Sequence, residues 1–202
     1  MAAQAATHPA TPPLTKVHNL IKDSGAEQAK GTQSGDKVKV PDWTPAKGSQ
    51  FTAVPYGAPD FLLKNSPGPK DRGKNFFAGG PSGNTSGAHQ RISLSSLRTL
   101  IKSGKASFTL SGWFGGWYNQ RDYAELTVVF FNSTGRKLAQ ATVGPVTARQ
   151  RHDAIKLLFR HKTGKVPAAA TTAVVYLRMV RKDGSYLDGY ADNLKLVIIK
   201  RH

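Results

Sequence analysis

The feature that most constrains this sequence is a series of short apolar or alternating segments, each followed by a cluster of Gly, Pro, Asn or Asp. Segments of this length, ended by turn-forming residues, are typical of strands rather than helices. The expected strands are Phe51–Tyr56, Asn75–Ala78, His89–Leu94, Ala106–Phe114, Tyr123–Asn132, Leu138–Val146, Ile155–His161, Ala173–Arg181 and Leu194–Lys200. About nine short strands with almost no helical pattern predict an all-β sandwich or barrel.

Two kinds of local signal refine this pattern. Ser95–Gly104 has a serine at its start, apolar residues at helical spacing and a glycine at its end, which predicts one short helix. Gly-containing segments at residues 133–135, Lys162–Lys165 and Lys182–Ser185 predict turns between strands.

The chain of 202 residues is long enough for one domain of ordinary size. Residues 1–16 are rich in Ala, Pro and Thr without a core-forming period, so we expect a flexible lead before a single domain over residues 17–202. An Ala-Gln-Ala within this lead is similar to the end of a secretory signal, which predicts an extracellular protein.

The composition excludes several kinds of site. The chain has no cysteine, which rules out disulfides, thiolate zinc sites and a cysteine nucleophile. No apolar stretch approaches the roughly 20 residues of a membrane-spanning helix. A formal net charge of +17 favours anionic partners. Alternatively, this charge serves only to keep the protein in solution.

Several motifs occur in a recognisable order. The chain contains Asn19–Glu27 before the first expected strand, Arg72–Gly80 and Ser111–Gly116 in the middle, and Asp188–Leu196 near the end. This order resembles the carbohydrate-binding-module branch of the galactose-binding-domain-like superfamily, particularly its standalone extracellular bacterial members, over about residues 17–199. The resemblance implies a jelly-roll β-sandwich of two antiparallel sheets that binds carbohydrate without catalysing a reaction.

The same resemblance implies a structural calcium ion. In these modules the two ends of the chain lie side by side, and an acidic residue from each end holds Ca²⁺. The positions that match here are Glu27 and Asp192. Backbone carbonyls and water would complete a shell of six to eight oxygens. Alternatively, the two carboxylates cap turns or pair with nearby Lys and Arg.

The best candidate for a ligand site is the segment that follows Gly115 and Gly116. Sugars bind to flat aromatic faces and to fixed polar groups, and this segment supplies both. The predicted ligand-binding residues are Trp113, Trp117, Tyr118, Asn119, Gln120 and Arg121. Trp113 has a second interpretation as a core residue, because it continues an alternating strand.

Basic residues in the second half of the chain give an alternative function. They predict a surface for an acidic polysaccharide, a teichoic-type polymer or nucleic acid, or alternatively a solvated face. The residues of this predicted patch are Arg149, Arg151, Lys156, Arg160 and Lys162.

Enzymatic activity is not expected. The sequence lacks the common nucleophile, metalloprotease and nucleotide-binding motifs, and its histidines are scattered. Asp122 and Glu125 are three residues apart on an expected strand, so they point to opposite faces and do not form a catalytic pair. A small polysaccharide lyase remains the least favoured alternative.

Overall fold

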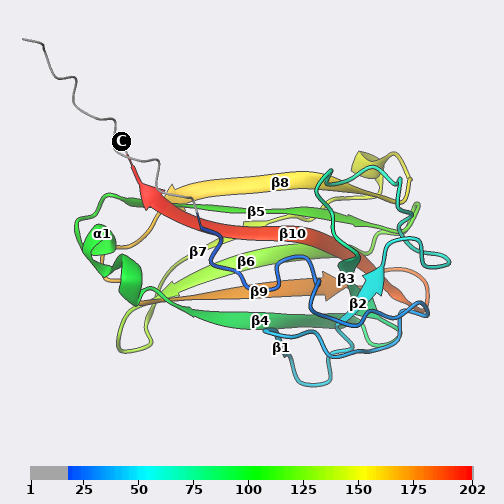
Figure 1. The fold of residues 1–202 in the computed structure, drawn as a ribbon, viewed down its shortest axis with the longest axis horizontal. Helices are drawn as coiled ribbons and strands as arrows, with labels where there is room; N and C mark the ends of the chain where they lie inside the picture. Colours follow the sequence, from blue (N-terminus) through cyan, green and yellow to red (C-terminus); the bar gives the residue numbers. More distant parts are fainter. Residues whose placement is uncertain (1–17, 202) are drawn as a thin grey trace, which may run out of the picture.

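The computed structural model describes residues 18–201 as two five-stranded antiparallel sheets packed face to face (Figure 1). Sheet A contains, in spatial order, β1 (Thr44–Pro45), β4 (Thr85–Ser93), β9 (Thr172–Val180), β6 (Tyr123–Phe131) and β7 (Lys137–Val143). Sheet B contains, in spatial order, β2 (Thr52–Pro55), β3 (Asn75–Gly80), β10 (Leu187–Lys200), β5 (Ala106–Gly116) and β8 (Lys156–Lys165). The predicted jelly-roll β-sandwich is confirmed.

Each of the nine expected strands overlaps one of β2 to β10, although β4 begins at Thr85 rather than at His89. The two-residue β1 is too short to leave an alternating pattern. The expected turn at Lys162–Lys165 was wrong, because these residues continue β8 opposite β5. β10 begins at Leu187 rather than Leu194. Its first half contains buried acidic residues, which look like turn residues in the sequence but have hydrogen-bond partners in the fold.

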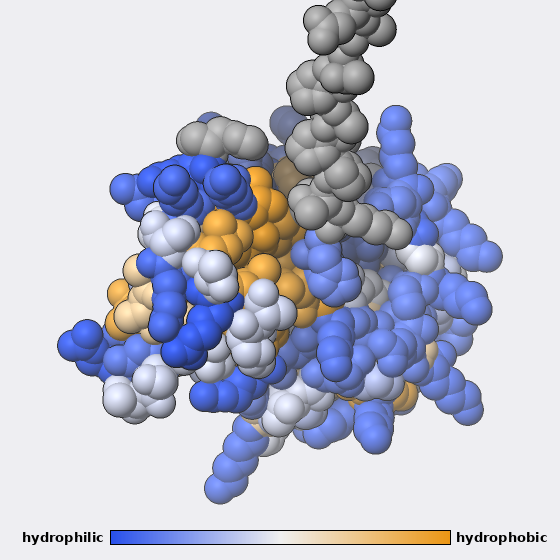
Figure 2. Space-filling model, turned by 60° about the vertical axis from the view of Figure 1, so that its left-hand side comes forward, coloured by the Kyte–Doolittle hydropathy of each residue, from blue (hydrophilic) through white to orange (hydrophobic). Residues whose placement is uncertain are grey.

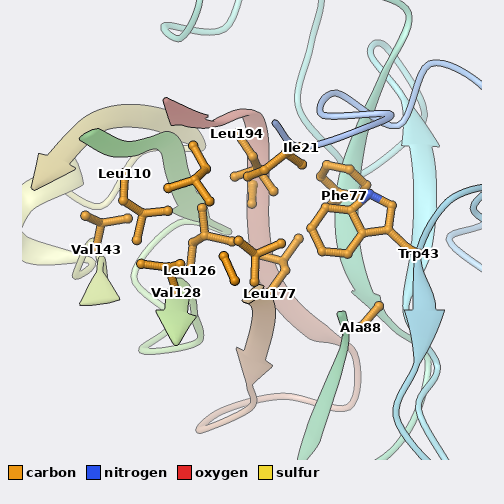
Figure 3. Packing of buried hydrophobic residues seen from close by; sticks show 14 of the residues in the cluster. Ile21, Trp43, Phe77, Ala88, Leu110, Leu126, Val128, Val143, Leu177 and Leu194 are labelled. Atoms are coloured by element: carbon orange, nitrogen blue, oxygen red, sulfur yellow. The ribbon is translucent and has the colours of Figure 1, made fainter. Parts of the chain in front are cut away.

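The core between the sheets follows from the two-residue period of the strands. Inward-facing side chains of β5, β6, β9 and β10 interdigitate, as shown for Leu110, Leu126, Leu177 and Leu194 in Figure 3. Trp43 packs with Phe51 and Phe77 at one end of this core. All of these side chains are at least 95% buried.

Sheet B has a second apolar cluster on its outer face. Segment 56–74 crosses this face and buries Phe76 and Tyr190 beneath Tyr56, Phe61 and Leu62. Strand β3 is therefore apolar on both sides, with Phe76 outward and Phe77 inward. Within residues 18–201 no comparable segment crosses sheet A, and outward residues such as Tyr176 and Arg178 are exposed to solvent.

The predicted helix is confirmed as a 3₁₀ turn, Ser95–Leu97, followed by α1 (Arg98–Lys102). Gly104 ends it with φ of +70°, a conformation that glycine adopts at little cost. Ser95 makes no capping hydrogen bond. The helix lies at the end of the sandwich where β10 finishes (Figure 1). No helix within residues 18–201 is long and apolar enough to span a membrane.

The two ends of the domain lie side by side, as the resemblance implied. The Leu20 amide donates to the Leu196 carbonyl at 2.9 Å, and Asn19 Oδ1 accepts from the Leu196 amide at 3.0 Å. The expected lead, residues 1–16, lies outside the described residues. Hydrophilic side chains cover most of the side of the molecule drawn in Figure 2, around a recessed apolar strip near its centre and smaller apolar areas at its edges.

Candidate functional site

The first candidate site is a groove of about 410 Å³ on the open outer face of sheet A. It lies across β4, β9 and β6, and the segment after β1 forms one wall. The side chains that give it chemical character are Lys47, His89, Glu125, Thr127, Tyr176 and Arg178. We call it the sheet A groove.

Tyr176 supplies the exposed apolar surface of this groove. Its side chain is 41% exposed, although it lies on the central strand β9, where most residues are buried. His89 lies directly opposite on β4, with the ring centroids 5.8 Å apart and the planes 30° apart. The strands hold both rings in place, so a ligand stacking here would meet a preorganised surface.

Polar groups surround the Tyr176 ring. Arg178 donates to Glu125 at 3.1 Å, which fixes a donor and an acceptor beside each other. The hydroxyl of Thr127 is hydrogen-bonded to that of Thr142 at 2.8 Å. Gly87 forms part of the floor, where a Cβ would approach the Leu177 carbonyl to 2.2 Å, so the floor there consists of backbone.

The sequence pattern alone does not single out this groove. Its signal is the alternation in β9, where Val175, Leu177 and Met179 point inward while Tyr176 and Arg178 point outward. An exposed tyrosine on a strand is ordinary by itself. Only the pairing of β4, β9 and β6 brings His89 and Glu125 to the same face.

The second candidate site is a pocket of about 610 Å³ between the loops at the opposite end of the sandwich from α1. Trp117 and Gln120 line it, together with Phe61, Tyr186 and Asp188. It therefore contains two of the six predicted ligand-binding residues. We call it the loop pocket.

The other four predicted ligand-binding residues lie outside this pocket. Tyr118 is 49% exposed and packs edge-on against Trp117, and Asn119 is exposed beside it. Arg121 is paired with Asp183 at 2.7 Å, so its guanidinium already has a partner. Trp113 is half-buried on the outer face of sheet B, opposite Phe159.

The loop pocket contains a buried carboxyl group. Asp188 is 7% exposed and accepts a hydrogen bond from the Tyr190 hydroxyl. Burial raises the pKa of Asp188 to about 6, and the negative charge of nearby Asp122 adds to this effect. Hydrogen bonding by Tyr190 and the charge of Arg151 act in the opposite direction.

Arg151 does not belong to a surface patch, contrary to the sequence-based expectation. Its side chain is fully buried, and the guanidinium donates to the carbonyls of Tyr118 at 2.8 Å, Gln120 at 3.1 Å and Val146 at 3.2 Å. Arg151 therefore positions the β5–β6 loop. The pattern of sequence charges gave no sign of this, because the carbonyls that bind it come from other segments.

The remaining members of the predicted patch are spread over two elements. Arg149 is exposed on a 3₁₀ turn, and Lys156, Arg160 and Lys162 lie at alternate positions of the edge strand β8. Arg160 donates to the neighbouring Phe159 carbonyl at 2.9 Å.

No protein-family model matches the sequence, and a sequence search finds no significantly similar curated protein. Solved structures do match the fold. A family 16 carbohydrate-binding module is 19% identical with a TM-score of 0.55, covering 89% of this chain and 99% of that one. The CBM22-1 xylan-binding domain of Paenibacillus barcinonensis Xyn10C is 14% identical with a TM-score of 0.52, covering 94% of this chain and 99% of that one.

The chain has the β-jelly-roll fold of carbohydrate-binding modules. A cyclase from Fischerella sp. TAU matches the same jelly roll, with 13% identity, a TM-score of 0.57, and coverage of 93% of this chain and all of that one. Binding modules and an enzyme therefore share this architecture, so function has to be argued from the sites.

The two predicted calcium ligands, Glu27 and Asp192, lie close to each other in the fold. A Cβ built on Gly25 would lie 3.1 Å from Asp192 Oδ1 and 3.7 Å from Glu27 Cγ, so both side chains border this glycine. Glu27 accepts hydrogen bonds from the amides of Lys74 and Asn75. Asp192 is fully buried and accepts from the Tyr56 hydroxyl at 2.6 Å.

Asp192 Oδ1 also accepts from the Asn193 amide at 2.7 Å, so both carboxylates bind protein groups, as the alternative of turn capping predicts. Burial raises the pKa of Asp192 to about 7, and the negative charge of Glu27 raises it further. Asp23 Oδ2, beside Glu27, is buried without a hydrogen-bond partner among the described residues. No group of three or more acidic or histidine side chains forms a metal site within residues 18–201, so backbone carbonyls and water would have to supply most ligands.

Proposed function

We propose that this protein binds carbohydrate without transforming it, with the sheet A groove as its main binding surface. The observation that carries the proposal is the Tyr176 ring, exposed at the centre of a sheet and surrounded by fixed polar groups. A pyranose ring stacks its C–H face on such an aromatic side chain, while its hydroxyls replace water on charged and hydroxyl groups. The jelly-roll fold supports the proposal.

Catalysis is not part of the proposal because the groove lacks a carboxyl pair. Glu125 is the only acidic side chain among the described residues that line it, and its carboxylate is paired with Arg178. Glycoside hydrolysis in most families needs two carboxyl groups on either side of the scissile bond. The groove can therefore orient a sugar but has no second carboxyl group for hydrolysis.

The groove is tested with affinity electrophoresis in gels that contain xylan, galactan, mannan or β-glucan. Tyr176→Ala should weaken retention by the bound polysaccharide about ten-fold or more, as for the loss of a buried aromatic contact. Tyr176→Phe should retain most of the affinity, because it keeps the ring. Melting curves of both variants separate loss of binding from loss of fold.

Trp117→Ala tests the loop pocket in the same gels. The proposal expects this variant to bind like the unmodified protein. If Trp117→Ala abolishes retention while Tyr176→Ala does not, the binding site is the loop pocket and our assignment is wrong. If the protein is not retained by any polysaccharide, and a release assay detects products, the non-catalytic proposal is wrong.

We also propose that Glu27 and Asp192 bind a structural Ca²⁺, which would join the first described segment to β10 and segment 56–74. The supporting observation is the proximity of two carboxylates, one of them buried, with no cationic side chain from residues 18–201 paired to either. Titration of the metal-free protein with CaCl₂ should show one site, and Glu27→Gln should weaken it strongly. Secretion, as the Ala-Gln-Ala segment predicts, would place the protein where Ca²⁺ is plentiful.

A further inference from the structure

A second surface with binding chemistry lies on the outer face of sheet B, where segment 56–74 leaves it uncovered. The strand register places Phe159 opposite Trp113, His161 opposite Ser111, and Lys165 opposite Ser107. On the other side of β5, Lys195 of β10 lies opposite Ser111. Cross-strand partners share one face of a sheet. We call this surface, formed by Trp113, Phe159, His161, Lys165 and Lys195, the basic platform.

The platform exposes aromatic surface that the fold does not need. Phe159 is 46% exposed, with the Trp113 ring 5.6 Å away at 56° and the His161 ring stacked on it at 5.8 Å and 19°. Trp113 also borders the second apolar cluster, so segment 56–74 forms a wall at this end of the platform. An exposed aromatic group on a rigid strand beside a wall is suited to holding one ring of a ligand.

The charge of the platform has one sign. Lys165 and Lys195 are exposed and make no ion pair within residues 18–201. Among the cross-strand pairs that β5 forms with β8 and β10, Asp192 is the only acidic residue. It is fully buried beneath Tyr56. A ligand on this face therefore meets ammonium groups, short hydroxyl side chains and the apolar side chains of Val197 and Ile199 on β10.

We propose that the basic platform binds a linear acidic polysaccharide, with sugar carboxylates at Lys165 and Lys195 and one sugar ring on Phe159 and Trp113. The platform lies on the opposite face of the sandwich from the sheet A groove. Binding at the platform is therefore independent of binding in the sheet A groove, and one molecule has room for two polysaccharide chains.

The aromatic geometry favours a saccharide over single-stranded nucleic acid. Proteins that bind single strands stack successive bases on successive accessible rings. Here His161 covers one side of the Phe159 ring, and Trp113 is half-buried and tilted, so little stacking surface remains for a second base. The hydroxyls of Ser107, Thr109 and Thr163, which share this face, match the hydroxyls of a sugar chain.

The test measures binding of the full chain to polygalacturonate by calorimetry. The variant Lys165→Glu/Lys195→Glu should lose affinity roughly ten-fold or more, because charge reversal replaces two attractions by repulsions. Phe159→Ala should lose affinity several-fold with little change in melting temperature. The matched control, Arg136→Glu/Lys137→Glu, makes the same change of charge at two exposed residues where the β6–β7 turn meets the start of β7, and should bind within about two-fold of the unmodified protein.

Three results would contradict the proposal that the basic platform binds acidic polysaccharide. The first is an equal loss of affinity in the Arg136/Lys137 control, which would indicate general attraction to a basic protein. The second is equal binding of fully methyl-esterified polygalacturonate, which has no free carboxylates. The third is tighter binding of a poly-dT oligonucleotide through the same side chains. Tyr176→Ala should leave polygalacturonate binding unchanged, so this test remains separate from that of the sheet A groove.

Discussion

The two outer faces of the sandwich begin with the same kind of strand pattern but end with different roles. Outward residues of sheet A, such as Tyr176 and Arg178, remain open to solvent and form a groove. Outward residues in the covered half of sheet B, such as Phe76 and Tyr190, are completely buried by segment 56–74. The comparison shows that a covering loop determines whether an outward strand residue contributes to stability or to recognition.

The largest expected effect is a difference in stability loss between an aromatic residue on the covered face and one on the open face. Phe76→Ala should lower the free energy of unfolding by about 3–5 kcal/mol, because it opens a cavity in a packed cluster. Tyr176→Ala on the open face should lower it by less than about 0.5 kcal/mol. Chemical denaturation of both variants measures the difference, and similar losses would show that the two faces are not distinct.

A second prediction concerns the loop end of the covered face. Arg151→Met should cost about 3 kcal/mol of stability, because the carbonyls of Tyr118, Gln120 and Val146 would lose their donor. Arg149→Met, two residues away on the surface, should change stability by less than about 0.5 kcal/mol. Denaturation curves again provide the measurement, and a stable Arg151→Met protein would contradict the structural role of the guanidinium.

Calcium provides a third test, because segment 56–74 buries Asp192. If Ca²⁺ binds there, an excess of about 100 times Kd should stabilise the protein by about 2.7 kcal/mol. Chelation by EDTA should lower the melting temperature accordingly, and Glu27→Gln should remove the difference. Identical melting curves with and without EDTA would exclude a stabilising site.

The smallest expected effect is a pH dependence of the free energy of unfolding, which arises because the Asp188 carboxyl is buried. The pKa of Asp188 is about 6 in the folded protein, above its ordinary value, because burial disfavours the charged form. The folded state therefore holds this proton more tightly than the unfolded state. The contribution of Asp188 to stability should be fully present below about pH 4 and be lost as the pH rises through 6, by an amount on the order of 2 kcal/mol.

Asp188→Asn isolates this contribution. It should make the fall in stability between pH 4 and 6 shallower. The metal-free protein serves for these measurements, since a bound cation would alter the titration of Asp192. An unchanged slope in Asp188→Asn would show that this carboxyl titrates normally.

The amino-acid sequence by itself determined the β-sandwich, because local periodicity and turn chemistry are short-range signals. Nine of the ten strands and the short helix before Gly104 follow from residues that are neighbours in the chain. The adjacency of Glu27 and Asp192 followed from the resemblance of the two end motifs. Trp117 and Gln120 were also identified from the sequence as residues of a loop, and both line a pocket there.

The tertiary structure alone decided which outward residues are accessible. Tyr176 and Phe76 each follow the alternation of a strand, and only segment 56–74 distinguishes their environments. In the same way, Arg151 reads as a surface cation in the sequence, but carbonyls from distant segments hold it in the interior. Accessibility depends on contacts between residues far apart in the chain, and a pattern of neighbouring residues contains no record of those contacts.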